Sequence, residues 1–221
     1  MTRTVVSAVI PVHNGERFLR AAIDSALDQS VPTEVIVVND GSTDGTAAII
    51  ASYGERIRPV HQEQRGLGGA RNSGIRAAGG DWVGFLDADD LWMADKTRRQ
   101  LAEAAVRPEV SIVFGHCVEF AEPGEQWSVR TAPFPALSAC AMLARRALFD
   151  QVGKFRETRE VGEFIEWYSR AQHAGAKELV LDDVVFRRRV HANNMTRVTT
   201  DKQEQYLAVV RAHLARQRGA S

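Results

Sequence analysis

Three carboxylates stand within four residues at Asp87-Ala88-Asp89-Asp90, directly after the apolar run Trp82–Leu86. Carboxylates this close repel one another, and a hard divalent cation removes the repulsion. Oxygen ligands suit magnesium or manganese, which proteins commonly hold with one or two carboxylates plus the phosphates of a substrate. The cluster therefore predicts a site for Mg²⁺ or Mn²⁺; the alternative is a solvated turn that caps the next helix.

Two other apolar runs also end in polar residues. The first ends in Pro11-Val12-His13-Asn14 and the second in Asn39-Asp40-Gly41-Ser42. Ligands of open parallel sheets bind beyond the carboxyl ends of the strands, so these residues and the aspartates are expected to share one crevice. Asp40-Gly41 alone is also explained by ordinary turn formation.

The segment Gly66-Leu67-Gly68-Gly69-Ala70 is not a dinucleotide-binding fingerprint. Its spacing is not G-x-G-x-x-G, and the preceding Gln62-Glu63-Gln64-Arg65 is too polar for the buried strand that such a site requires. Small residues here would let the backbone approach a ligand closely. Arg71 would then supply a cation for a phosphate or a ribose.

Hydrophobic periodicity predicts the elements that carry these residues. Apolar runs predict strands, and apolar residues at helical spacing predict helices between them. The predicted strands are Val5–Val12, Val35–Val38, Ile57–His61 and Trp82–Leu86, and the predicted helices are Phe18–Leu27, Ala47–Ala51 and Ala70–Ala78. This alternation predicts an α/β fold with a mainly parallel central sheet and helices on both faces.

The second half of the chain is less regular. The expected helices are Asp95–Val106, Cys140–Gln151, Glu163–Ala174 and Tyr206–Arg216, and the expected strands are Val110–Phe114, Val118–Phe120 and Leu179–Val190, with a loop at Glu122–Pro135. No linker divides the chain. We therefore expect a single domain over residues 1–200, with a regular first part in roughly 1–95 and a small irregular part in 96–200, followed by a helical tail at 201–221.

Composition narrows the function classes. The 221 residues include 28 basic and 28 acidic side chains, so no net field attracts nucleic acid. Apolar runs are too short for a membrane helix, and the first residues lack a signal peptide. Cys117 and Cys140 have no metal-ligand spacing and fit buried thiols in a reducing compartment. We expect a soluble cytoplasmic protein with no integral membrane segment, for which peripheral contact with a membrane remains open.

Four blocks, in order and spacing, resemble the family 2 glycosyltransferases, whose fold is called GT-A. The blocks are Val9-Ile10-Pro11-Val12-His13-Asn14-Gly15, Val37–Thr46, Ala70-Arg71-Asn72-Ser73-Gly74 and Phe85-Leu86-Asp87-Ala88-Asp89-Asp90. The resemblance covers roughly Val5–Val190. It implies a single GT-A-like catalytic domain that binds a nucleotide-diphosphate sugar and a divalent metal, Mn²⁺ or Mg²⁺. Nucleotide-sugar binding would lie in roughly 1–95, and the acceptor and catalytic part in roughly 96–200.

The resemblance also implies roles for the matching positions. The residues of the sugar-donor site would be Pro11, His13, Asn14, Asp40, Arg71, Asp87, Ala88 and Asp89. Asp40 would accept a hydrogen bond from the base, which favours uracil, although thymine offers the same edge. Asp87 and Asp89 match the family's D-x-D motif, with Asp87 toward the ribose and Asp89 on the metal. His191 would reach the metal or the diphosphate; the alternative is an ordinary histidine.

The family's catalytic base falls on a departure from the family pattern. Gly162-Glu163 stands where the family usually has Glu-Asp, so Glu163 is the expected base, with Glu166 or Glu160 as substitutes. Trp92 and Trp167 lie close enough in the sequence to the motifs to contact a sugar on the acceptor side.

The expected reaction is direct displacement with inversion, from a nucleotide-diphosphate sugar to an acceptor hydroxyl. The acceptor is unknown and could be a glycan, a lipid-linked sugar, a small molecule or a peptide. A non-catalytic sugar-nucleotide binding module is the first alternative, supported only by the departure at Gly162-Glu163. A nucleotidyltransferase is the second, but Pro11–Glu16 lacks the basic triphosphate loop that it needs.

Overall fold

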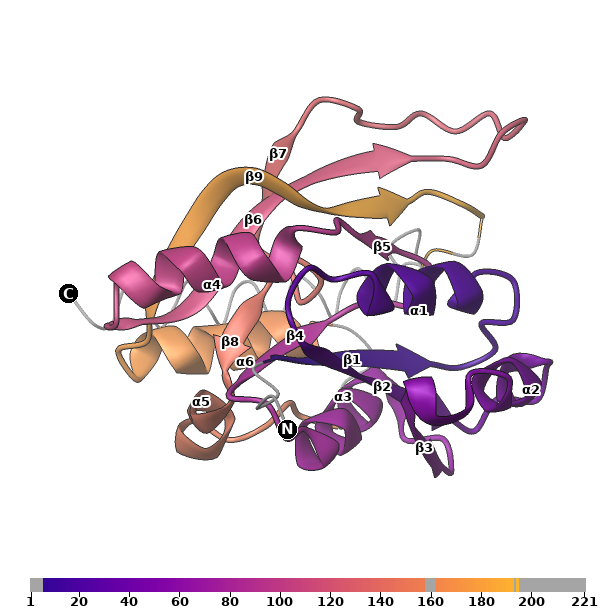
Figure 1. Ribbon diagram of the computed structural model, residues 1–221, viewed down its shortest axis with the longest axis horizontal. Coiled ribbons are helices and arrows are strands. Elements are labelled where there is room, and N and C mark those ends of the chain that lie inside the picture. Colours follow the sequence, from indigo (N-terminus) through magenta and orange to yellow (C-terminus); the bar gives the residue numbers. More distant parts are fainter. Residues whose placement is uncertain (1–5, 158–161, 193, 195–221) are drawn as a thin grey trace.

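The computed structural model describes residues 6–157, 162–192 and 194. A nine-stranded sheet runs through them in the order β3-β2-β1-β4-β8-β6-β9-β5, with β7 paired to β6 (Figure 1). The strands are β1 (Val6–Val12), β2 (Thr33–Asp40), β3 (Arg58–Gln62), β4 (Trp82–Phe85), β5 (Leu91–Trp92), β6 (Val110–Phe120), β7 (Phe134–Ala136), β8 (Leu143–Arg145) and β9 (Lys177–Arg189). The helices are α1 (Leu19–Leu27), α2 (Thr46–Ala51), α3 (Gly66–Ala77), α4 (Lys96–Val106), α5 (Arg146–Gln151) and α6 (Glu163–His173), with a 3-10 turn at Gly54–Arg56.

The first four strands form a parallel sheet that opens beside β1. The chain builds outward from β1 to β2 and β3, then returns to place β4 on the other side of β1. β1 pairs with β2 as far as Val12 but with β4 only as far as Val9, so its two neighbours separate beyond that residue. Open α/β sheets bind their ligands at this kind of switch point.

Pro11 marks the place where the sheet opens. β1 is buried along its whole length, as its apolar sequence predicts. The carbonyl of Val9 accepts a hydrogen bond of 3.0 Å from the N–H of Leu86 on the β4 side. Pro11 lies two residues further along, so its backbone faces the same side beyond the end of β4. Its missing N–H therefore interrupts no strand pairing.

Helices cover both faces of the sheet, with α1 and α4 on one face and α3, α5 and α6 on the other (Figure 1). α3 lies so close to β1 that a Cβ built on Gly74 would stand 2.1 Å from Cγ1 of Val9. α3 begins at Gly66, four residues before the predicted start at Ala70. The glycine-rich segment is therefore the first turn of the helix and not a separate loop.

The helix predicted over Cys140–Gln151 is wrong in its first half. Leu143–Arg145 forms β8, which pairs antiparallel with both β4 and β6, and only Arg146–Gln151 is helical. β8 joins the parallel strands to the second half of the sheet. Pairing on both sides overrides the local preference of these residues, as tertiary context often does for short segments.

The long strands β6 and β9 build the rest of the second half. β6 is one irregular strand where two short strands were predicted, and β9 runs parallel to it with register shifts. The two-residue strand β5, which the sequence did not predict, pairs with β9. The predicted helices that correspond to α4 and α6 are confirmed.

The predicted fold class, an α/β fold with a largely parallel sheet covered on both faces, is confirmed. The expected helix over Tyr206–Arg216 and the candidate base Glu160 lie outside the described residues. Within the described part of the chain, every helix is too short or too polar to span a bilayer.

Candidate active site

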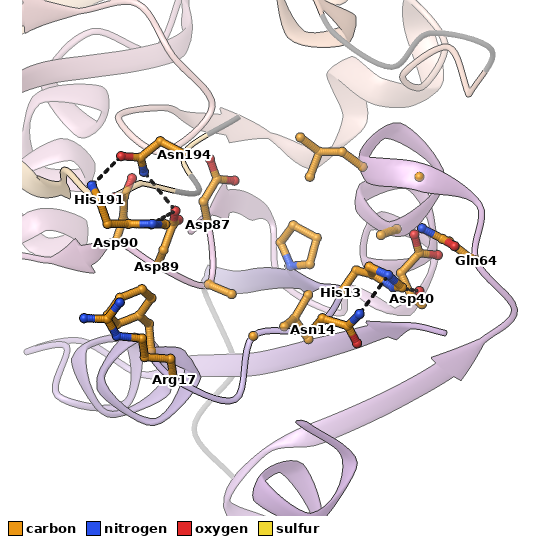
Figure 2. Close-up of a pocket in the computed structure, with 18 of the residues that line it drawn as sticks. His13, Asn14, Arg17, Asp40, Gln64, Asp87, Asp89, Asp90, His191 and Asn194 are labelled. Carbon is orange, nitrogen blue, oxygen red and sulfur yellow. Dashed lines mark hydrogen bonds and ion pairs between the residues drawn. The ribbon is translucent and has the colours of Figure 1, made fainter. Parts of the chain in front are cut away.

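A cavity of about 900 Å³ opens where β1 separates from β4. Its walls come from the carboxyl ends of β1, β2 and β4, the start of α3 and the segment after β9. The lining residues are Pro11, Val12, His13, Asn14, Gly15, Arg17, Phe18, Asp40, Gln64, Gly66, Leu67, Ala70, Asp87, Ala88, Asp89, Asp90, Arg188, His191 and Asn194. Figure 2 shows Asp40 and His13 at one end, and Asp89 with His191 at the other. The three strand ends thus share one crevice, as predicted.

Asp40, at the end of β2, is held by hydrogen bonds to one of its two carboxylate oxygens. Oδ1 accepts from Nε2 of Gln62 at 2.6 Å and from the backbone N–H of Arg65 at 2.8 Å. No donor among the described residues contacts Oδ2. Nδ1 of His13 lies 2.8 Å from the backbone oxygen of Asp40 and donates to it, because a carbonyl can only accept. The carboxylate therefore keeps one acceptor oxygen for a ligand.

Asn14 joins the loop after β1 to the loop after β2. It adopts a left-handed backbone conformation with φ of 51°, which asparagine tolerates better than most residues. Its side-chain Oδ1 accepts from the N–H of Thr43 at 2.8 Å, and its own N–H donates to Oγ of Ser42 at 3.0 Å. These bonds fix the backbone of the loop that carries His13.

Asp89 contacts the segment after β9 at the other end of the cavity. Its Oδ2 accepts from Nε2 of His191 at 2.9 Å and from Nδ2 of Asn194 at 3.3 Å (Figure 2). Asn194 also accepts from the N–H of His191 at 2.7 Å, which fixes the histidine relative to Asp89. Residues 102 positions apart in the sequence thus meet in one cluster.

Asp90 has a different environment from the two aspartates before it. It is buried, and its Oδ1 accepts the backbone N–H of Arg189 at 2.8 Å. Burial, and then the negative charges of Asp89 and Asp87, raise its pKa well above the ordinary value. Nε of Arg189 donates to the backbone oxygen of Asp89 at 2.8 Å. Asp90 and Arg189 therefore attach the aspartate loop to β9.

Arg71 does not line the cavity, but stands behind it between two carboxylates. Its NH2 donates to Oδ1 of Asp87 at 2.8 Å, and its NH1 pairs with Glu163. Burial alone would lower the pKa of Arg71, but the charges of Asp87 and Glu163 outweigh burial and raise it. Its Nε is buried and has no hydrogen-bond partner among the described residues.

Glu163 is the first residue of α6 and is only 5% exposed. It follows Gly162, whose φ of 78° lies in the left-handed region that favours glycine. A left-handed residue before α6 accounts locally for the glycine at the position where the family motif has a glutamate. Oε1 of Glu163 faces Arg71, and among the described residues no donor contacts Oε2.

Glu166, the first substitute for the base, is fully engaged elsewhere. Its buried Oε1 pairs with Nε of Arg156 at 3.1 Å and with Nε of Arg170 at 3.0 Å. Arg170 also donates to the backbone oxygens of Val152 and Lys154. This arrangement anchors the segment before α6 and gives Glu166 a structural environment.

The expectation that Trp92 and Trp167 contact an acceptor sugar is wrong, because both lie in the core. Trp92 is 4% exposed, and its indole N–H donates to the backbone oxygens of Phe85 and Cys140 at 3.2 Å each. Trp167 is fully buried and donates to the backbone oxygen of Gly153 at 3.0 Å. Tryptophan near a motif in sequence is a weak signal, since packing is its usual role.

Two groups of side chains could offer ligand atoms to a cation. Asp89 and His191 already face each other at the cavity, and carboxylate oxygen with imidazole nitrogen suits Mn²⁺ or Mg²⁺. Asp87, Asp90 and Cys140 also bring an oxygen or sulfur within 4.8 Å of one another. However, burial and then Asp87 raise the pKa of the Cys140 thiol well above its ordinary value. A protonated thiol is a poor ligand, so Asp89 and His191 fit a hard cation better.

The sequence analysis missed several lining residues. Arg17 and Phe18 directly precede α1, Gln64 precedes α3, Leu67 lies in its first turn, Arg188 lies near the end of β9, and Asn194 follows that strand. Asn194 stands three residues after His191, a spacing at which asparagine often bonds a neighbouring backbone N–H. The three-residue spacing of His191 and Asn194 is the signal that could have identified Asn194. The other missed residues carried no such sequence signal.

The chain matches known proteins in sequence and in fold. A family model described as glycosyl transferase family 2 matches residues 7–168. An uncharacterized glycosyltransferase of Rickettsia typhi is 31% identical over 225 residues, covering 93% of this chain and 70% of that protein. The uncharacterized glycosyltransferase EpsJ of Bacillus subtilis is 34% identical over 168 residues, covering 74% of this chain and 46% of its own length.

Two solved structures share the fold. The S. aureus TarS fragment 1–349, in complex with UDP-GlcNAc, aligns with a TM-score of 0.75 at 22% identity, over 95% of this chain and 65% of that chain. The mannosyltransferase PcManGT of Pyrobaculum calidifontis, in complex with GDP-Man and Mn²⁺, aligns with a TM-score of 0.67 at 22% identity, over 86% of this chain and 58% of that chain. The predicted GT-A-like fold is confirmed.

Proposed function

This chain belongs to glycosyl transferase family 2, and we propose that it is a metal-dependent inverting enzyme that moves a sugar from a UDP-sugar to an acceptor hydroxyl. A glycosyltransferase with a nucleotide-sugar donor agrees with the family. The observation that carries the finer proposal is one cavity with Asp40 at one end and the Asp89–His191 pair at the other. Asp40 can accept a hydrogen bond from the base of a nucleotide at one end, and the Asp89–His191 pair can meet the diphosphate at the other end.

The nucleotide occupies the end of the cavity near Asp40. Oδ2 of Asp40 accepts the imide N–H of uracil, while Pro11 and His13 flank the base and Asn14 holds their loop. Thymine has the same imide edge, so a dTDP-sugar is the nearest competitor. Asp87 points toward the ribose, and Ala88 leaves room between the two aspartates for the nucleotide.

Asp89 and His191 would hold Mn²⁺ or Mg²⁺ at the other end of the cavity. When bound, the cation supplies positive charge that stabilises the departing diphosphate. His191 is kept in place by Asn194, and the loop of Asp89 by Arg189. Arg71 contributes through Asp87, which it orients from behind, and not by direct contact with phosphate.

Glu163 is the proposed base. Arg71 fixes its Oε1, and Oε2 accepts the proton of the acceptor hydroxyl. The hydroxyl oxygen forms a bond to the anomeric carbon as the bond from that carbon to the diphosphate breaks. Attack opposite the leaving group inverts the anomeric centre, and the nucleoside diphosphate departs.

The acceptor is a hydroxyl of a glycan, a lipid-linked sugar, a small molecule or a peptide. We place its recognition in the acceptor half, residues 96–200, within a single catalytic domain over residues 1–200. The loop between β6 and β7 reaches the cavity lining through the ion pair of Glu125 with Arg17, at 2.8 Å. It is therefore the described segment best placed to contact an acceptor.

A thermal-shift and calorimetry panel tests the donor. UDP-, dTDP- and GDP-sugars are titrated with and without Mn²⁺ into the wild type, Asp40→Ala and the control Asp28→Ala, an exposed residue outside the cavity. We expect the tightest binding for a UDP-sugar, dependent on Mn²⁺, and loss of that binding in Asp40→Ala alone. Metal-independent binding, or equal binding by both variants, would contradict the proposal.

A further inference from the structure

A chain of hydrogen bonds runs from the protein surface to the carboxylate of Asp40. NH2 of the exposed Arg76 donates to Oγ of Ser73 at 2.7 Å, and the Ser73 hydroxyl donates to Oε1 of Gln62. Nε2 of Gln62 donates to Oδ1 of Asp40 at 2.6 Å. Ser73 and Asp40 are buried, and Gln62 is half-buried between them.

Arg76 at one end and Asp40 at the other determine the direction of every hydrogen bond in this network, because a guanidinium only donates and a carboxylate only accepts. A guanidinium can only donate, so the oxygen of Ser73 must accept from it, and the hydroxyl proton of Ser73 is free to go to Gln62. A side-chain amide has one accepting and one donating end. With its oxygen facing Ser73, Gln62 must present its NH₂ group to Asp40. The amide orientation of Gln62 is thus favoured from both ends, by the donor Arg76 at the surface and by the acceptor carboxylate of Asp40.

The consequence falls on Asp40. Gln62 and the N–H of Arg65 both donate to Oδ1, so this oxygen is used by the protein. Oδ2 has no donor among the described residues, and Asp40 lines the cavity. A base whose edge lies against Oδ2 of Asp40 meets a hydrogen-bond acceptor, so that edge must offer an N–H. A ligand edge with only an acceptor would leave two unpaired acceptors facing each other.

We propose that Gln62, Ser73 and Arg76 are positioning residues that fix the Asp40 side chain through Oδ1 and leave Oδ2 to accept from the base, and thereby select nucleoside diphosphates whose base carries a ring N–H. Uracil meets this requirement, whereas cytosine has an unprotonated ring nitrogen at the same position. The inference rests on the proposed function, because it assigns the base to Asp40. It adds residues outside the cavity wall that control the choice of base.

The test measures the preference for UDP over CDP by calorimetry in the presence of Mn²⁺. Arg76→Glu replaces the surface donor with a group that accepts the Ser73 proton, and Ser73→Ala removes the link. We expect each to reduce the UDP-to-CDP preference by about fivefold, the scale of one hydrogen bond. N3-methyl-UDP should bind the wild type as weakly as CDP.

Conservative and matched variants separate positioning from a loss of structure. Arg76→Lys keeps a group that only donates, and Ser73→Thr keeps the hydroxyl, so both should retain the wild-type preference. Arg58→Glu makes the same change of charge on the exposed strand β3. Arg58 donates to the backbone oxygen of Ala77 and takes no part in the hydrogen bonds that lead to Asp40. This variant should also retain the preference.

Three outcomes would count against these claims. A wild type that binds UDP and CDP equally overturns the inference. An unchanged preference in both Arg76→Glu and Ser73→Ala, with UDP binding intact, overturns the inference but leaves the proposed function standing. A wild type that binds none of UDP, dTDP, GDP and CDP overturns both.

Discussion

The guanidinium of Arg71 donates directly to the carboxylate of Glu163, joining α3 to α6 across 92 positions of the chain. Both side chains are almost completely buried. The same guanidinium reaches Asp87 at 2.8 Å, so the proposed base and the first aspartate of the D-x-D motif share one cation. The two halves of the chain are thereby coupled at the site.

Replacing Glu163 with glutamine should remove the proposed base and leave the nucleotide end intact. We expect hydrolysis of the UDP-sugar, in which water replaces the acceptor, to fall by about 100-fold or more, the usual contribution of a general base. The Kd for UDP with Mn²⁺ should be unchanged. Steady-state release of UDP and calorimetry measure the two quantities. Undiminished turnover would show that Glu163 is not the base.

Replacing Glu166 with glutamine in the same helix should have the opposite profile. Arg156 and Arg170 would lose a shared carboxylate, and Arg170 is held beside the backbone oxygen of Lys154. We expect a loss of about 2 kcal/mol in the free energy of unfolding, below the 3–5 kcal/mol of fully buried pairs because Arg156 is exposed. Turnover per folded molecule should be retained. Urea unfolding measures the loss of stability, and active-site titration gives the turnover per folded molecule. A stable but inactive variant would make Glu166 the base.

Metal binding should depend on the Asp89–His191 pair. We expect Asp89→Ala and His191→Ala each to abolish the stabilisation by Mn²⁺ of the UDP complex, because each removes one proposed ligand. Cys140→Ala is the control, since burial keeps this thiol protonated by raising its pKa. Manganese titrations followed by electron paramagnetic resonance would measure the bound ion. Loss of Mn²⁺ in the Cys140 variant alone would move the site to Asp87 and Asp90.

Gly74 should not tolerate a larger residue. A methyl group at Gly74 would stand 2.1 Å from Cγ1 of Val9, so α3 or β1 must shift. Overpacking of this kind costs about 1–3 kcal/mol, which exceeds the helix propensity gained from alanine. We expect Gly74→Ala to lower the urea midpoint and Gly74→Ala with Val9→Ala to recover part of it. An unchanged midpoint in the single variant would contradict the packing described.

Lys96 should make stability depend on pH in a defined direction. Burial lowers its pKa to about 7, from 10.5 in the unfolded chain. Between these values the unfolded chain binds a proton that the folded chain lacks, so this residue's contribution to stability rises with pH from about 7 to 10.5 and falls toward neutrality. Each proton corresponds to about 1.4 kcal/mol per pH unit.

Lys96→Met removes that titration. We expect the free energy of unfolding of the wild type, measured relative to the variant, to increase between pH 7 and pH 9. Comparison with the variant cancels the contributions of groups that do not interact with Lys96. Parallel profiles for the two proteins would mean that Lys96 stays charged, held by Gln100 and the backbone oxygen of Met142.

The first half of the chain was predictable because its signals are local. β1 and β2 are buried runs, and the polar residues that follow them lie at a shared edge as parallel strands require. β8 was missed because its conformation depends on pairing with β4 and β6, which no local pattern contains. Position in sequence likewise could not show that Trp167 packs in the core.

The environment of charged groups was the least predictable feature. Arg71 was expected to meet the ribose or diphosphate, but it lies behind the cavity, bonded to two carboxylates. Asp90 follows the motif directly and yet faces β9. In both cases a partner comes from an element more than 90 positions away, which no local pattern shows.

The attachment of Asp90 to Arg189 has a consequence for biosynthesis. The two residues are 99 positions apart, so a nascent chain exposes the aspartates long before their partners on β9 emerge from the ribosome. The parallel strands that carry Asp40 precede both. The contacts that hold the loop of Asp89 and Asp90 therefore form only after β9 and the residues that follow it have been synthesised.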